Sequence, residues 1–415
     1  MASRGDHLVR ADRRFVTGGG LIARLAAPAF AGILEQLDQR LLVGGIHGTL
    51  PSGEPRRLGF HAPGPEPVVH LHSWLALVRL ATSGSVGWYK AWERGEWSSP
   101  NPVPLFDLFM RNAVSLGQTA RAKGPGRWIN AFAHRLRDNA PARARDNIAA
   151  HYDLGNDFYA AWLDETMTYS AARLDEANES LEAAQLRKVH QLLDRLELEP
   201  GQRLLEIGCG WGTLAIEAAK RGVHVVGLTL STEQKAWADR SIAEAGLSDR
   251  VTIRLQDYRA NAEKFDAVVS AEMVEAVGER WWGAYLATIA GSLVPGGRAA
   301  LQFISIRPEL FDRYAASADF IQTYIFPGGM LLHEPRFAAL AKVHGLSWEE
   351  RDGFSQDYAR TLNQWRVRYD TAVTVGRLSD FSDAFHRLWR YYLMYCEGGF
   401  LGGGIDVAQV TMRRL

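Results

Sequence analysis

Short apolar segments alternate with longer amphipathic segments from about residue 185 to residue 304. Short runs of Val, Leu and Ile are typical of strands buried on both faces, and Ala and Leu at helical spacing are typical of helices. The predicted strands are Arg203–Ile207, Val223–Leu228, Val251–Leu255, Phe265–Ser270 and Arg298–Ile304, and the predicted helices are Thr213–Arg221, Ser231–Ala245 and Trp282–Leu293. Strands separated by such helices predict a mostly parallel, doubly wound α/β sheet.

The first 120 residues follow a less regular pattern, in which Gly and Pro interrupt short apolar runs. Pro67–His72 is typical of a short strand and Leu105–Phe109 of a helix, so we predict a smaller N-terminal α+β accessory domain over residues 1–120. A basic stretch over residues 121–146 follows, and a solvated linker and a patch facing anionic lipid head groups both fit its charge. The large domain is predicted over residues 147–415.

Length, charge and cysteine content narrow the classes of protein. A chain of 415 residues is too long for one ordinary core, which agrees with two domains. Its 47 basic residues balance 47 acidic ones, which argues against a nucleic-acid partner bound through bulk charge. Two cysteines, Cys209 and Cys396, favour a reducing cytoplasm over a disulfide framework or structural zinc, and we expect no metal. The longest apolar stretch, Leu21–Leu34, is too short to span a bilayer.

A glycine-rich turn follows the first predicted strand. The sequence there is Glu206-x-Gly208-x-Gly210-x-Gly212, and a helix begins directly afterwards. Glycines let the backbone turn sharply and let a ligand approach without meeting Cβ atoms. The carboxyl ends of strands in open α/β sheets are also where ligands bind. The turn is therefore a candidate cofactor loop.

Two cofactor classes compete for this loop. A dinucleotide site favours Gly-x-Gly-x-x-Gly and an acidic residue about 20 positions later. Here the glycine spacing differs, and the second strand ends at Thr229–Gln234 without an acid at its tip. Asp257 instead follows the third strand, where it could meet an adenine amino group. The pattern favours S-adenosylmethionine over a dinucleotide.

Several motifs resemble the cyclopropane fatty acid synthases and mycolic acid methyltransferases. They occur in the family's order and spacing over residues 150–415. The segments are His151–Tyr159, Leu163–Asp164, Met167–Ser170, Thr229–Ser231 with Gln234, Glu272–Gly278, Tyr324–Gly329, Tyr358–Trp365 and Tyr391–Phe400. The front part resembles the longer, phospholipid-acting members only around Gly95-Glu96-Trp97. The resemblance implies a seven-stranded, Rossmann-like methyltransferase sheet.

The resemblance also implies how the cofactor is held. Tyr169 and Ser170 would contact its methionine end, and Glu206 belongs to the loop beneath it. The other implied contacts are Gly208, Gly210 and Gly212 under the cofactor, Thr229, Leu230 and Gln234 at the ribose, and Asp257 and Tyr258 at the adenine.

The reaction centre departs from the family pattern. Glu275 and Tyr358 match family residues that help to hold a bicarbonate base together with a cysteine and a histidine. Ala171 stands in place of that cysteine and Gln302 in place of the histidine, which puts bicarbonate in doubt, although Gln302 can still donate a hydrogen bond. Glu275 is the candidate base. Cys396 falls where the family has a cysteine, and either a catalytic role or buried packing fits it.

The resemblance implies methyl transfer from S-adenosylmethionine to the double bond of an unsaturated fatty acyl chain on a phospholipid. Proton loss from the new methyl group would give a cyclopropane ring, and proton loss elsewhere a methyl- or methylene-branched chain. Methylation of a polar small molecule and catalytically silent lipid binding stay open as other classes. We expect peripheral contact with the cytoplasmic face of the inner membrane and no nucleic-acid partner, and a homodimer is left open.

Overall fold

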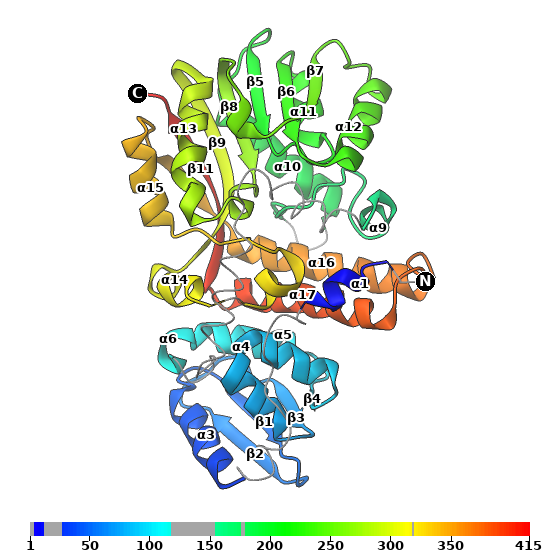
Figure 1. Ribbon diagram of the computed structural model, residues 1–415, viewed down its shortest axis with the longest axis vertical. Helices are drawn as coiled ribbons and strands as arrows, with labels where there is room; N and C mark the ends of the chain where they lie inside the picture. Colours follow the sequence, from blue (N-terminus) through cyan, green and yellow to red (C-terminus); the bar gives the residue numbers. More distant parts are fainter. Residues whose placement is uncertain (1–3, 12–26, 118–153, 176–178, 318) are drawn as a thin grey trace. The chain divides into compact units, whose positions relative to one another are not determined.

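The computed structural model describes residues 4–11, 27–117, 154–175, 179–317 and 319–415 (Figure 1). The chain divides into two compact units, each built from separate chain segments. The first unit comprises Met1–Arg137, Glu309–Pro327 and Ser379–Ile405, and the second comprises Asp138–Pro308, Gly328–Leu378 and Asp406–Leu415. The predicted basic stretch, 121–146, lies outside the described residues. Segments near the C-terminus thus belong with the N-terminal part, whereas the sequence predicted consecutive domains.

The second unit contains a seven-stranded sheet in the order β10-β11-β9-β8-β5-β6-β7. The strands are β5 (Arg203–Ile207), β6 (His224–Thr229), β7 (Val251–Leu255), β8 (Phe265–Ala271), β9 (Leu293–Ile306), β10 (Glu349–Gly353) and β11 (Ile405–Arg413). Strand β5 pairs in parallel with β6 and β8, and β8 pairs in parallel with β9. Strands β10 and β11 are antiparallel. The predicted mostly parallel, seven-stranded α/β sheet is confirmed.

The second unit also contains α-helices, of which α11, α12 and α13 connect its parallel strands. The helices are α9 (Asn156–Ala160), α10 (Leu181–Asp194), α11 (Thr213–Lys220), α12 (Thr232–Glu244), α13 (Trp282–Ser292), α15 (Glu334–Val343) and α16 (Ser355–Thr374). The short 3-10 helices are η2 (Tyr258–Ala260), η3 (Val274–Ala276) and η4 (Glu279–Trp281). One buried cluster joins α10, α11 and α12 to the sheet through residues such as Leu192, Ala215, Ile242 and Leu204. This apolar layer fixes the sheet, so that the strand ends hold their side chains in constant positions.

The first unit contains a four-stranded sheet in the order β2-β1-β3-β4. Its strands are β1 (Gly45–Thr49), β2 (Pro55–Gly59), β3 (Val68–Leu71) and β4 (Trp97–Ser98). Its helices are α1 (Asp6–Val9), α3 (Ala27–Arg40), α4 (Leu75–Glu93), α5 (Val103–Arg111), α6 (Ala113–Leu116), α14 (Pro308–Ala315), the π-helix η5 (Ile321–Ile325) and α17 (Asp383–Leu401). The predicted smaller α+β part is therefore present.

Two glycines explain why α17 belongs to the first unit. A Cβ atom at Gly398 would lie 2.4 Å from the Cβ of Phe106, and one at Gly402 would lie 2.8 Å from the carbonyl oxygen of Asp107. Only glycine permits α17 to approach α5 so closely. Helix α17 is therefore packed on a segment nearly 300 residues earlier in the chain.

Aromatic rings fill the interior of the first unit. Tyr89 lies 5.0 Å from Phe320, 4.8 Å from Tyr324 and 5.0 Å from Tyr391, measured between ring centroids. All four side chains are fully buried. We call these four residues the aromatic cluster. Three of its members come from the aromatic C-terminal third of the sequence, and they pack as core.

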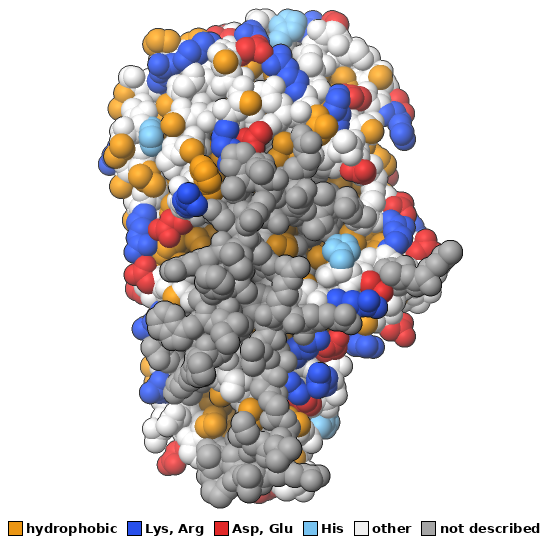
Figure 2. Space-filling view, viewed as in Figure 1, with side chains coloured by type: hydrophobic (Ala, Val, Ile, Leu, Met, Phe, Trp, Pro, Cys, Tyr) orange, Lys and Arg blue, Asp and Glu red, His pale blue; other side chains and the backbone are white. Residues whose placement is uncertain are grey.

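Lysines and arginines are interspersed with acidic side chains over the described surface that faces the viewer in Figure 2. Within the described ranges, every helix is too short or too polar to cross a membrane.

Candidate functional site

A pocket opens at the carboxyl ends of the central strands of the second unit. Residues from the ends of β5, β6, β7 and β8 line it, together with the segment before α10. The predicted cofactor residues that line it are Tyr169, Ser170, Glu206, Gly208, Gly210, Thr229, Leu230, Gln234, Asp257 and Tyr258. Folding has therefore gathered side chains that are almost 90 residues apart in sequence.

The glycine loop has the left-handed backbone that its sequence predicts. The φ angles of Gly208, Gly210 and Gly212 are 81°, 52° and 95°. A Cβ atom at Gly208 would lie 2.7 Å from Cγ of Met273, whereas one at Gly210 would meet no atom within 4 Å and would project into free space. Gly212 does not line the pocket; it precedes α11, where a Cβ atom would lie 3.0 Å from Ala238. Gly208 and Gly210 thus keep the pocket floor open, and Gly212 allows two helices to pack.

The end of β6 is fixed by a helix cap. Ser231 accepts a hydrogen bond from the backbone N–H of Gln234 and so begins α12. The Thr229 hydroxyl donates to the side-chain oxygen of Gln234 at 2.9 Å. Both side chains are buried. The cap therefore holds the two predicted ribose contacts in fixed positions.

The Asp257 carboxylate forms an ion pair with Arg259, two residues later. It accepts hydrogen bonds from Nε and Nη2 of Arg259, at 2.9 Å and 2.6 Å, and from the Arg259 backbone N–H at 2.9 Å. Partial burial opposes ionisation, but these hydrogen bonds outweigh it and lower the pKa of Asp257. Asp257 therefore enters the pocket as an ion-paired carboxylate.

The opposite end of the pocket contains a buried lysine that the sequence analysis did not select. Lys188 on α10 is 1% exposed, and its Nζ donates to the Ser170 hydroxyl at 2.5 Å. Burial lowers its pKa to about 8, although nearby Glu272, Asp164 and Glu206 favour its charged form. Burial also raises the pKa of Glu206 to about 8, an effect that Lys188 partly offsets. Burial thus shifts the pKa values of both groups toward each other, while their mutual attraction opposes the shift.

Glu272 connects most of the reaction-centre residues. Its Oε1 accepts hydrogen bonds from the Ala171 backbone N–H at 2.8 Å and from Nε2 of Gln302 at 2.7 Å. Its Oε2 accepts a hydrogen bond from the Tyr358 hydroxyl at 2.7 Å. Loss of hydration raises its pKa, and these hydrogen bonds and Lys188 oppose that increase. The φ angle of Glu272 is 50°, in the left-handed region that residues other than glycine rarely adopt.

Glu275 occupies a different environment. Its Oε1 accepts a hydrogen bond from the backbone N–H of Ile304, and its Oε2 is buried with no partner among the described residues. Loss of hydration, together with the charge of Glu272, raises its pKa to about 8. Glu272 lines the pocket, whereas Glu275 does not. The geometry therefore favours Glu272 over Glu275 as the carboxylate that faces a ligand.

The remaining candidates divide between the two units. Gln302 and Tyr358 meet at Glu272, as does the backbone of Ala171. Cys396 lies on α17 in the first unit, so it is not among the residues gathered around Glu272. Burial raises the pKa of its thiol, which keeps it protonated. We found no group of three or more potential metal ligands in the described part of the chain.

Comparison with known proteins identifies relatives. Residues 139–410 match the family described as mycolic acid cyclopropane synthetase. The chain is 37% identical over 365 residues to the tuberculostearic acid methyltransferase of Mycobacterium tuberculosis, covering 84% of this chain and 83% of that protein. It is 34% identical over 337 residues to the cyclopropane-fatty-acyl-phospholipid synthase of Escherichia coli, covering 81% of this chain and 85% of the relative.

Solved structures of cyclopropane synthases are also similar to this chain. The cyclopropane synthase MmaA2 from Mycobacterium tuberculosis superposes with a TM-score of 0.59 at 31% identity, covering 65% of this chain and 98% of that one. A mycolic acid cyclopropane synthase, CmaA1, complexed with SAH and CTAB, gives a TM-score of 0.60 at 30% identity, with the same two coverages.

Proposed function

Since this chain belongs to the mycolic acid cyclopropane synthetase family and is an S-adenosylmethionine-dependent methyltransferase, we propose that it methylates the double bond of an unsaturated fatty acyl chain carried on a phospholipid. Two relatives whose names specify fatty acyl products support this substrate class. The pocket fits the cofactor because predicted contacts for its methionine end, ribose and adenine, from Tyr169 to Tyr258, all line it, and because Gly210 leaves space above the loop.

The bound cofactor supplies an electrophilic methyl group. Tyr169, Ser170 and the glycine loop would hold its methionine end, and Thr229 with Gln234 its ribose. Because an alkene is a weak nucleophile, the protein must hold the two reactants in line and exclude water. Methylation of an alkene leaves a positive charge on the acyl chain, and a base must then accept a proton.

We propose Glu272 as that base, and its hydrogen bonds are the observation that carries the mechanism. The donors that surround it are the Ala171 backbone, Gln302 and Tyr358. The family resemblance places a bicarbonate ion among the residues at these positions. Here a carboxylate of the protein already accepts their hydrogen bonds. We therefore propose that proton removal needs no added bicarbonate.

The product that we favour is a branched chain that keeps one carbon–carbon double bond. The loss of two family anion ligands, at Ala171 and Gln302, and the similarity to a tuberculostearic acid methyltransferase support this choice. A cyclopropane ring is the second candidate, supported by the similarity to the Escherichia coli synthase.

One experiment tests substrate and product together. Purified full-length protein is incubated with S-adenosylmethionine labelled with ¹³C at the methyl group and with vesicles of an unsaturated phosphatidylglycerol. Carbon and proton spectra of the extracted lipid then distinguish a ring carbon from a methyl or methylene carbon, which mass alone does not. We expect labelled methyl or methylene carbon, with olefinic protons retained and with no effect of removing bicarbonate.

The control uses vesicles with the same head group and saturated chains, which should take up no label. Label in a ring carbon would favour the second candidate. Absence of lipid label with unsaturated vesicles, under conditions where the protein binds cofactor, would refute the proposed substrate.

We further propose that the protein contacts the cytoplasmic face of the inner membrane peripherally, with the N-terminal part as an accessory unit. The substrate class supports this, because the acyl chains lie in the bilayer. Flotation with anionic vesicles should decrease as ionic strength rises. Binding that ignores both salt and anionic lipid would contradict an electrostatic contact.

A further inference from the structure

A chain of buried amides links Glu272 to an arginine at the edge of the second unit. The Gln302 side-chain oxygen accepts a hydrogen bond from Nε2 of Gln409 at 3.1 Å. The Gln409 oxygen in turn accepts one from Nε of Arg195 at 3.2 Å. Gln302 and Gln409 are 1% and 0% exposed. These amides lie on the neighbouring strands β9 and β11, so the sheet itself holds the chain together.

Every hydrogen bond in this chain points the same way. Arg195 donates to Gln409, Gln409 donates to Gln302, and Gln302 donates to Glu272 at 2.7 Å. An amide can present either an oxygen or an N–H group, but a guanidinium can only donate. The direction is therefore set at the Arg195 end and passed on by each amide.

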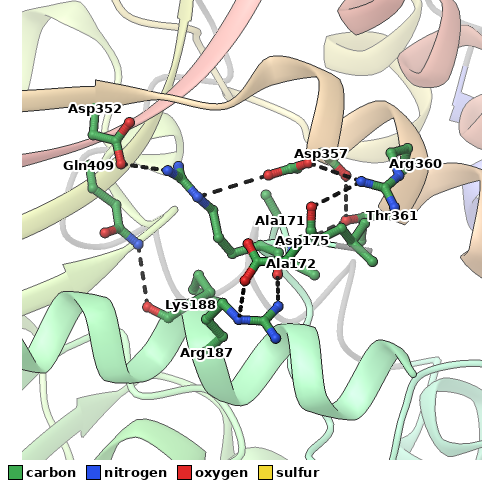
Figure 3. Close-up of polar contacts among 12 residues, drawn as sticks. Ala171, Ala172, Asp175, Arg187, Lys188, Asp352, Asp357, Arg360, Thr361 and Gln409 are labelled. Atoms are coloured by element: carbon green, nitrogen blue, oxygen red, sulfur yellow. Dashed lines mark hydrogen bonds and ion pairs between the residues drawn. The ribbon is translucent and has the colours of Figure 1, made fainter. Parts of the chain in front are cut away.

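A second, longer contact favours the same orientation of the Gln409 amide. Its Nε2 also approaches the backbone carbonyl of Lys188 at 3.4 Å, and Figure 3 shows this contact between the labelled Gln409 and Lys188. A carbonyl oxygen can only accept. Reversing the Gln409 amide would place its oxygen against that carbonyl and its N–H groups against the guanidinium. Both neighbours thus require the same orientation.

Arg195 is itself held in place. It is the residue that follows α10, and its Nη1 donates to the Glu350 carbonyl at 2.7 Å and to the Thr411 hydroxyl at 3.3 Å. Its side chain is 15% exposed, and the Asp352 carboxylate lies 3.8 Å from Nη2. An arginine at the protein edge is thus anchored on three sides while its Nε points inward.

We propose that Arg195, acting through Gln409 and Gln302, fixes the direction of a hydrogen-bond chain that keeps Glu272 a hydrogen-bond acceptor. This inference rests on the proposed role of Glu272 as the base. A reversed Gln302 would face Glu272 with its oxygen, and only a protonated Glu272 could then form the bond. Arg195 and Gln409 are accordingly positioning residues that act on Glu272 without touching substrate.

Other ionisable groups also interact with Glu272 and set the background for its titration. They are Lys188 from α10, Glu275 from η3 and the Tyr358 hydroxyl from α16. None of them belongs to the amide chain. Variants of Arg195 and Gln409 therefore leave this background in place and change only the donor that Gln302 offers.

The test is a pH titration of Glu272, followed by the infrared absorption of its protonated carboxyl group and assigned by its loss in Glu272→Gln. In Arg195→Gln the end residue can donate or accept, so we expect the midpoint to rise by about one pH unit, a tenfold change in ionisation constant. Gln409→Leu retains the arginine charge but interrupts the chain, and it should show the same rise. Arg195→Lys keeps a donor-only group and should stay near the wild-type midpoint.

Arg203→Gln is the charge control, because it removes a positive charge from the same unit by the same substitution, at an arginine that is paired with Glu263. Its midpoint should be unchanged. A wild-type midpoint in both Arg195→Gln and Gln409→Leu, or an equal rise in Arg195→Lys, would overturn the proposal. Transfer of the labelled methyl group is measured on the same preparations. Its absence in the wild type would overturn the proposed function, while the titration still decides the role of Arg195.

Discussion

The surroundings of Glu272 and the aromatic cluster are two interior regions with opposite chemistry. Around Glu272, the second unit places Lys188 and Glu206 out of contact with water and gives them hydrogen bonds or opposite charges. In the aromatic cluster, the only ionisable groups are tyrosine hydroxyls, and burial raises the pKa of Tyr391 well above its ordinary value. The first region contains groups whose pKa values are shifted toward neutral pH, and the second contains none. Burial therefore marks a candidate reaction centre only where it acts on ionisable groups of this kind.

Among the variants that test this comparison, Glu272→Gln should have the largest effect on turnover. Removal of a general base typically costs about a hundredfold to ten-thousandfold in rate. We expect that loss in turnover at saturating cofactor, whereas Glu275→Gln should lose less than about tenfold because its carboxylate faces the Ile304 backbone. Rates of labelled methyl transfer to vesicles provide the measurement. The reverse order of the two variants would return the role of base to Glu275.

Tyr358→Phe should have the next largest effect. It removes the hydroxyl that donates to Oε2 of Glu272 at 2.7 Å. A hydrogen bond to a charged group contributes about 1.5–3 kcal/mol, so turnover should fall by roughly tenfold to a hundredfold. Tyr369→Phe, on the same helix and fully buried, is the matched control. Equal losses in both variants would indicate a packing effect.

Glu275 also makes a testable contribution to stability. Its pKa is about 8 in the folded protein, above the ordinary value of 4.5. The stability that it contributes is therefore present below about pH 4.5 and is lost as pH rises through 8. The melting temperature of the cofactor-free protein should fall between pH 5 and 8, and Glu275→Gln should make that fall smaller, by about 1 °C for each kcal/mol of linkage in a chain of this length. An unchanged pH slope in calorimetry would contradict the raised pKa.

The smallest effect is expected in the first unit. Cys396→Ala removes a thiol that burial keeps protonated, so methyl transfer should stay within about twofold of wild type. A large loss of activity in Cys396→Ala would restore the catalytic interpretation of this cysteine.

Tyr391→Phe removes a buried hydroxyl that has no partner among the described residues, and it should leave the melting temperature unchanged or slightly raised.

Most of the sheet was predictable because its signal is local. Arg203–Ile207 and Val251–Leu255 match the observed strands β5 and β7 residue for residue, since an apolar run between turn residues determines each. Strand β11 (Ile405–Arg413) and the edge strand β10 were not predicted. The β10 sequence, Glu349–Gly353, is polar and partly or fully exposed, so it carries no apolar pattern. The packing of α17 on α5 likewise depends on two glycines whose role appears only when distant segments meet.

The cofactor loop was predictable for the same local reason, whereas the centre around Glu272 was not. Glu272 and Glu275 both follow β8, and the family resemblance selected Glu275. Which carboxylate faces the pocket depends on the left-handed turn at Glu272 and on the partners that it meets from β9 and α16. Lys188 gave no signal beyond one charged residue in an amphipathic helix. Its place in the pocket depends on burial, which no local pattern reveals.

The left-handed backbone at Glu272 has an evolutionary consequence. A non-glycine residue in this conformation typically costs about 1–3 kcal/mol. A glycine here would relieve that strain, but it would also leave the donors of Gln302 and Tyr358 without their acceptor, at a comparable cost. Selection for stability alone should therefore favour a residue that tolerates this backbone and still offers an oxygen to those donors, whereas selection for turnover must retain the carboxylate. Libraries of this chain sorted only for thermal tolerance should accumulate asparagine at position 272. Its frequency in such a library would measure directly how strongly folding and catalysis conflict at one residue.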